Sequence, residues 1–143
     1  MVQIKKATAR AAAIKREGDE QLKIDYDLVR EILLFVEDES DGIRKFYVKT
    51  FVDIHGRDRA KEIIYTMNYL FDIGYVTGVT QQKINPIIKD ITPKGREFIE
   101  ATKDNTVWHK TKEKFGDELS SKGISLIVET ALSIGKSILG NLF

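Results

Sequence analysis

The sequence contains no cysteine and only two prolines, and no stretch of it is both long and apolar. The lack of cysteine excludes a disulfide scaffold, a thiolate nucleophile and any zinc or iron–sulfur site with cysteine ligands. The longest unbroken apolar run, Ile32–Val36, is far too short to cross a bilayer. No charged stretch followed by an apolar core opens the chain, so we expect a cytoplasmic protein that does not require a membrane.

With 143 residues, the chain is long enough for one hydrophobic core and too short for two full-sized domains. The formal charge is near balance, at +1, but it is unevenly distributed. Five basic and no acidic residues precede position 17, which leaves 18 basic against 22 acidic residues, a formal charge of −4, over 17–143. Because non-specific nucleic-acid binding depends on neutralising phosphates, such binding must come from a local basic patch or from the N-terminal segment.

Two amphipathic helices are predicted in the first half of the chain. Apolar residues recur at helical spacing over 25–36, where the first residue, an aspartate, can cap the helix. The same spacing over 58–73 predicts a second helix, again capped by its first aspartate and ended by Gly74. Between them, alternating aromatic and β-branched residues over Phe46–Ile54 predict a half-buried strand.

A β-hairpin is predicted between residues 75 and 91, with its polar tip at 80–83. Thr92 and Pro93 then form a helix start, a hydroxyl cap followed by proline at the first helical position. This helix is expected to break near Asp104 and to resume, with Trp108 packing onto the core.

The order of these elements resembles the winged-helix plan, a helical core followed by a β-hairpin wing. The runs Tyr69–Val76 and Ile91–Ile99 are similar to a bacterial winged-helix signature on either side of the wing. More closely, Lys23–Arg30 and Asp104–Trp108 resemble motifs of a small prophage-associated winged-helix family of unknown function (YjcQ-like). The similarity covers about residues 22–143 and brings no activity with it.

The resemblance implies an α+β fold, with a winged-helix domain over 22–116 and a C-terminal amphipathic helix within 117–143. A full helix-turn-helix has two adjacent helices before the wing. The predicted strand at 46–54 takes the place of the first of them, which argues against conventional reading of DNA bases.

Sequence motifs for catalysis are absent, so we expect neither an enzyme nor a cofactor. His55 and His109 are the only histidines. Asp53 and His55 have the spacing of two metal ligands, but no third ligand is evident, and a role in a turn is the expected one.

Binding is therefore the expected activity, and two classes of partner stay open. A transcriptional regulator of phage or prophage type would contact DNA from the start of the second helix and from the wing tip, through Arg57, Arg59, Lys61, Gln81, Gln82 and Lys83. A protein–protein adaptor or inhibitor of a host protein would use the opposite pole of the same helix, which holds Glu62, Tyr65 and Tyr69 beside Asp58. Alternatively, the chain itself covers the two tyrosines.

The two ends of the chain carry predictions of their own. Residues 1–21 are expected to form a basic extension, and either translation also starts at Leu22 or this arm supplies phosphate contacts. The last segment has an apolar stripe that either the domain or a second copy must cover, and we expect self-association through it. Its members are Ile124, Ile127, Val128, Ala131, Ile134, Ile138, Leu139 and Leu142.

Overall fold

The computed structural model describes residues 23–80 and 83–140. Its elements are α1 (Tyr26–Glu39), α2 (Val48–His55), the 3-10 helix η2 (Arg57–Arg59), α3 (Ala60–Asp72), β1 (Val76–Val79), β2 (Ile87–Ile91), α4 (Pro93–Thr102), α5 (Asn105–Phe115), the 3-10 helix η3 (Gly116–Ser121) and α6 (Ile124–Gly140). The protein is thus a mostly helical α+β fold, and the antiparallel pairing of β1 with β2 confirms the predicted hairpin. None of the helices in these two ranges is long and apolar enough to span a membrane.

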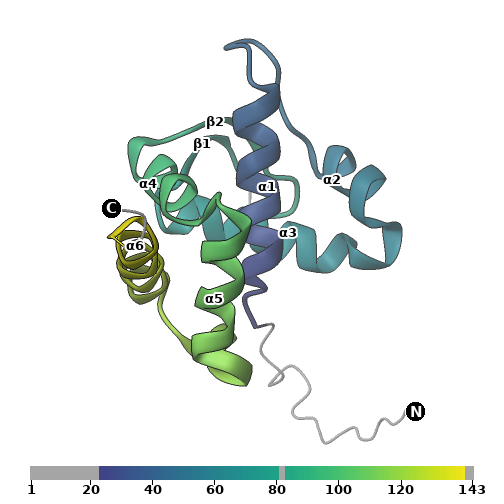
Figure 1. The fold of residues 1–143 in the computed structure, drawn as a ribbon. Helices are drawn as coiled ribbons and strands as arrows, with labels where there is room; N and C mark the ends of the chain where they lie inside the picture. The colour runs from purple at the N-terminus through teal and green to yellow at the C-terminus, as the bar shows by residue number, and fades with distance from the viewer. Residues whose placement is uncertain (1–22, 81–82, 141–143) are drawn as a thin grey trace, which may run out of the picture.

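Helix α1 lies at the centre of the molecule, between the α2–α3 pair and the α4–α5 pair (Figure 1). The side-chain oxygen Oδ1 of Asp25 accepts a hydrogen bond from the Leu28 N–H at 3.2 Å, as the predicted cap requires. The apolar stripe of α1 is fully enclosed by its neighbours and consists of Leu28, Val29, Ile32, Leu33 and Val36. The helix runs to Glu39, three residues past its predicted end.

The predicted strand over Phe46–Ile54 is wrong. Only Phe46 pairs, through one antiparallel bridge to Ile88, and α2 begins at Val48. A strand would place Phe51 on the same face as the polar side chains of this segment. The helix buries Phe51 completely, and the burial of this large aromatic outweighs the β-propensity of its neighbours.

Helix α2 is the first helix of the two-helix unit before the hairpin, which the sequence pattern did not predict. Because α2 and α3 are adjacent helices that precede the hairpin, the order of elements is compatible with a winged helix. Gly56 joins the two helices with a φ of 109°, a value that favours glycine. Asp58 lies in η2 and does not cap α3, contrary to the prediction, whereas Gly74 follows α3 with a φ of 75°, as predicted.

The break between α4 and α5 lies where the sequence predicted it, with Asp104 capping α5. Trp108 is 3% exposed, and its Nε1–H donates to Asp27 Oδ1 at 2.8 Å, which ties α5 to α1. Thr92 caps α4, as predicted, by accepting the Gly95 N–H at 3.1 Å.

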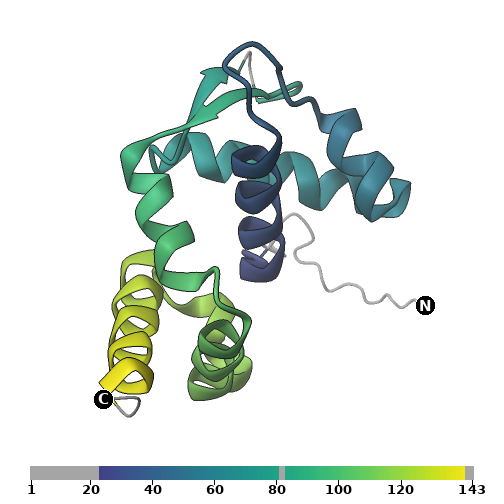
Figure 2. The ribbon, with the colours of Figure 1, turned by 45° about the horizontal axis from the view of Figure 1, so that its top comes forward.

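Helix α6 packs against α4 and α5 of the same chain, on the side of the molecule away from α2 (Figure 2). Of the predicted stripe, Ile124, Ile127 and Ala131 are buried, while Val128, Ile134 and Ile138 are partly buried. Leu139 is 56% exposed, and Leu142 lies outside the described residues. The domain itself therefore covers most of the stripe, so this face does not need a second copy for its burial.

Candidate functional site: the outer face of α3

The outer face of α3 and the hairpin tip enclose an open groove with a volume of about 400 Å³. The side chains that line the groove are Lys61, Ile64, Tyr65, Asn68, Tyr69, Asp72 and Lys83. Tyr65 is the most exposed large apolar side chain of α3, at 38%, whereas Ile64 and Tyr69 are half-buried. The centre of the groove is thus aromatic and aliphatic, and its charges lie at the two ends.

The exposed pole of α3 is rotated from the predicted one. Asp58 lies before the helix, Glu62 is half-buried, and Thr66 is only 2% exposed. The Thr66 hydroxyl donates to the Glu62 carbonyl at 2.7 Å within the helix. This side of α3 faces the start of α1, which explains why the open face is centred on Tyr65 and not on Glu62.

The hairpin tip is fastened to the C-terminal half of α3. The Asn68 side-chain amide donates to the Lys83 carbonyl at 3.0 Å and accepts from the Thr80 hydroxyl at 3.1 Å. The Lys83 ammonium contacts both carboxylate oxygens of Asp72 at 2.8 Å. These contacts fix one wall of the groove, and Asp72 neutralises a lysine that was predicted to contact DNA.

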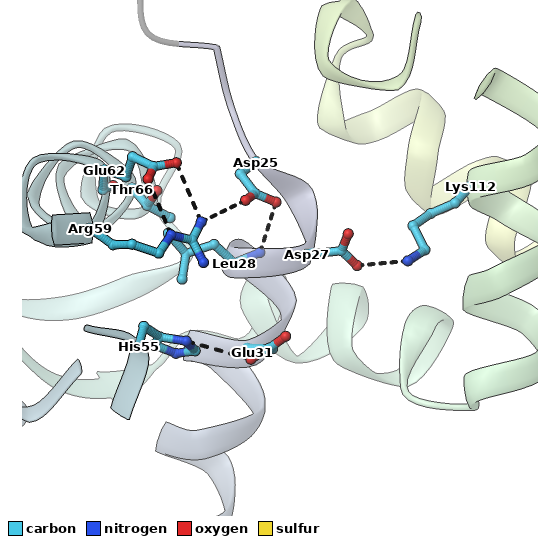
Figure 3. A network of polar contacts seen from close by, with 9 residues as sticks. All are labelled: Asp25, Asp27, Leu28, Glu31, His55, Arg59, Glu62, Thr66 and Lys112. Carbon is cyan, nitrogen blue, oxygen red and sulfur yellow. Dashed lines mark hydrogen bonds and ion pairs between the residues drawn. The ribbon is translucent and has the colours of Figure 1, made fainter. Parts of the chain in front are cut away.

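Arg59, a second residue predicted to contact DNA, is also neutralised. Its guanidinium lies between the Asp25 carboxylate, at 2.9 Å, and the Glu62 carboxylate, at 3.1 Å (Figure 3). The hydrogen bonds that Arg59 donates to Glu62 and to Asp25 raise the pKa of Arg59, although desolvation partly opposes them. Arg59 therefore joins α1 to α3, and Glu62, a predicted protein contact, serves mainly to hold it.

Two further tyrosines, Tyr26 and Tyr75, lie close to Tyr69. The Tyr26 hydroxyl donates to the Lys122 carbonyl at 2.6 Å, and burial, with Tyr69 nearby, raises the pKa of Tyr26. Burial also raises the pKa of Tyr75 to about 12. Both phenols stay neutral at ordinary pH, so neither of them supplies acid–base chemistry to the groove.

The remaining predicted DNA contacts divide into two groups. Arg57 and Lys61 are exposed at the start of α3 and form no ion pair within the described residues. Gln81 and Gln82 lie outside the described residues. Ile64 and Asn68 also line the groove, although neither was predicted as a site residue. The helical spacing of Ile64, Asn68 and Asp72, each four residues from the next, is the signal that would have placed them on one face.

Within 23–80 and 83–140, no three histidine, aspartate or glutamate side chains lie close enough together to hold a metal ion. Asp53 pairs with Lys49 at 2.8 Å, and the His55 Nδ1 lies 3.8 Å from Glu31, so the two residues that have the sequence spacing of metal ligands contact different partners. His109 lies elsewhere, beside Glu113 on α5.

The fold and this surface define a small α+β protein with a two-helix unit, a hairpin and an aromatic groove on the outer face of α3. The chain belongs to the family described as "Hypothetical protein (DUF2513)", whose model matches residues 23–122. Neither a curated protein nor a solved structure matches the chain significantly. The family match includes the whole groove and ends before α6.

Proposed function

We propose that this chain is a non-enzymatic winged-helix module that binds another protein through the groove on the outer face of α3. The observation that carries the proposal is the composition of that face: Tyr65 and Tyr69 lie beside Ile64, and the nearby Lys83 is already paired with Asp72. A setting in a phage or prophage is part of the proposal and is supported only by the motif resemblance.

Tyrosine is suited to such a surface because it buries a large area and loses little side-chain entropy on binding. The groove is fixed in the unbound chain by the contacts of Asn68 with the hairpin, so a partner would not have to order it. Lys61 at one end and the Asp72–Lys83 pair at the other provide polar contacts at the rim. An apolar centre with a polar rim is the usual anatomy of a protein interface.

A site-specific photocrosslinker tests the proposal directly. With p-benzoyl-phenylalanine in place of Tyr65, we expect irradiation in the native host to give one discrete protein adduct, identified by mass spectrometry. The matched control places the same group at Tyr47, which is 45% exposed on another surface, and should not give this adduct. Adducts with nucleic acid only, or the same adduct from both positions, would contradict the proposal.

DNA is the second candidate, because α2 and α3 have the order of a helix-turn-helix and Arg57 and Lys61 are exposed at the start of α3. Two cations that form no ion pair within residues 23–80 and 83–140 predict weak binding, with a slope of log affinity against log salt of about −2. Fluorescence anisotropy with duplex DNA measures this slope. A slope of about −6 or steeper, reduced by K61Q but not by K110Q on α5, would favour DNA over protein as the partner.

A further inference from the structure

A second groove lies between α1 and α2, and none of its lining residues belongs to the α3 face. Its volume is about 460 Å³. Leu34 and Phe35 of α1 and Ile54 of α2 form the apolar surface, and Ile54 is 50% exposed although it belongs to an ordered helix. An exposed aliphatic residue beside two half-buried apolar side chains provides an anchor site for a partner.

The charged residues along this groove are carboxylates. Glu31, Glu37 and Asp38 line it, and neither lysine nor arginine does. Glu37 lies 3.8 Å from Arg96, and Glu31 lies 3.8 Å from the His55 ring (Figure 3), while Asp38 has no ion pair within the described part of the chain. None of these contacts has the short, direct geometry of a strong ion pair.

The end of α1 strengthens the negative potential at this place. The C-terminal end of a helix carries partial negative charge, and basic side chains there are the favourable ones. The last turn of α1 instead contains Glu37, Asp38 and Glu39 and has no basic residue. Because Arg44 pairs with Glu39 at 2.7 Å, the negative charge of this turn at the groove comes from Glu37 and Asp38. A cation from outside the chain would therefore be attracted both by the carboxylates and by the helix end.

We propose that the α1–α2 groove docks a basic amphipathic peptide segment of a partner protein. An aliphatic side chain of the segment would pack against Ile54 and Phe35, and lysine or arginine on either side of it would meet Glu31 and Asp38. The complementarity of charge and the apolar surface select this partner chemistry, since an acidic or uncharged segment would leave the carboxylates unpaired. The binding mode is that of a helix laid into a groove.

The probe is a fluorescein-labelled synthetic helix of about 14 residues, with leucine at every third or fourth position and lysine elsewhere. Anisotropy with the full chain should show saturable binding that weakens as salt increases. We expect the double variant E31Q/D38N to weaken binding about fivefold to tenfold, and I54S to weaken it about fivefold.

Matched controls separate this site from general attraction to an acidic protein. E97Q/E129Q removes the same charge from two exposed positions elsewhere, and I43S removes an isoleucine that is 84% exposed and lies outside the groove. Both should bind the probe within about twofold of the parent chain. Circular dichroism should show all variants folded, because every replaced side chain is exposed.

Three results would overturn the proposal: no binding of the probe, equal loss in the control variants, or a dimer in sedimentation that I54S abolishes. The last result would assign the groove to a second copy of the chain. Because the probe does not involve Tyr65, its failure leaves the proposed function of the α3 groove untouched.

Discussion

Arg59 donates a hydrogen bond to Oδ2 of Asp25 at 2.9 Å, while Oδ1 of the same carboxylate accepts the Leu28 N–H. One side chain thus caps α1 and joins it to the start of α3, although the two residues are 34 positions apart. Because α3 carries the groove, this carboxylate helps to set the position of the candidate site relative to the core.

Two substitutions of Asp25 separate its roles. Asp25→Ala removes both the cap and the ion pair, and we expect it to lower the free energy of unfolding by about 1–2 kcal/mol. Asp25→Asn keeps a capping oxygen and loses only a half-exposed ion pair, so it should cost less than about 1 kcal/mol. Urea unfolding followed by the fluorescence of Trp108 measures both values. Equal losses for the two variants would show that the cap contributes nothing.

Arg59→Met provides the complementary measurement. If Asp25→Asn removes only the ion pair, the double variant Asp25→Asn/Arg59→Met should lose less free energy of unfolding than the two single variants lose in sum. Strict additivity would mean that the 2.9 Å contact has no energetic coupling in solution.

The helices that the sequence predicts well are those whose apolar spacing is unambiguous. The stripes of α1 and α3, the hairpin and the α4–α5 break at Asp104 are all found in the structure. Helix α2 was missed because its eight residues are rich in β-branched and aromatic types, and a period of two fits so short a segment as well as a helix does. Only the complete burial of Phe51 decides between them, and burial depends on tertiary packing.

The candidate site was predicted less well than the fold. Tyr65, Tyr69 and Lys61 are indeed brought to one groove, but Arg59 and Lys83 were expected to be available to a ligand. Their partners, Asp25 and Asp72, are 34 and 11 positions away in sequence. No pattern within a single helix reveals such pairs, because they form only when α1 and the hairpin pack against α3.

Two glycines inside helices should respond to alanine in opposite directions. At Gly95 an added Cβ would lie 2.4 Å from the carbonyl oxygen of Tyr75, the residue that precedes β1. Gly95→Ala should therefore destabilise the protein by about 1–3 kcal/mol. At Gly135 of α6 the nearest atom is 4.0 Å away, so Gly135→Ala should stabilise it by about 0.5–1 kcal/mol through helix propensity. Thermal unfolding measures both, and a stabilising Gly95→Ala would refute the close approach.

Stability should fall as the pH rises from about 10 to about 12. The pKa of Tyr75 is raised by burial from its ordinary value of 10.0 to about 12. In this interval the unfolded chain has lost the phenolic proton and the folded chain still holds it, so rising pH favours unfolding. The contribution of the protonated Tyr75 phenol to the free energy of unfolding is fully present below about pH 10. Urea unfolding at several pH values should show that Tyr75→Phe loses less free energy of unfolding between about pH 10 and pH 12 than the parent chain. Equal losses in the two proteins would show that this phenol does not cause the pH dependence.

The last prediction concerns α6, which lies beyond the residues that the family model matches. Ile127 is fully buried against the core, so Ile127→Ala should cost about 2–4 kcal/mol. Leu132, on the same helix but 47% exposed, is the matched control, and Leu132→Ala should change stability by less than about 0.5 kcal/mol.

Urea unfolding at two protein concentrations distinguishes packing of α6 within its own chain from a contact between two copies. If the stripe packs on α4 and α5 of its own chain, the midpoint of Ile127→Ala and of the parent should not depend on concentration. A midpoint that rises with concentration in the parent, and a large loss in Leu132→Ala, would instead indicate that the exposed side of α6 is a contact between copies.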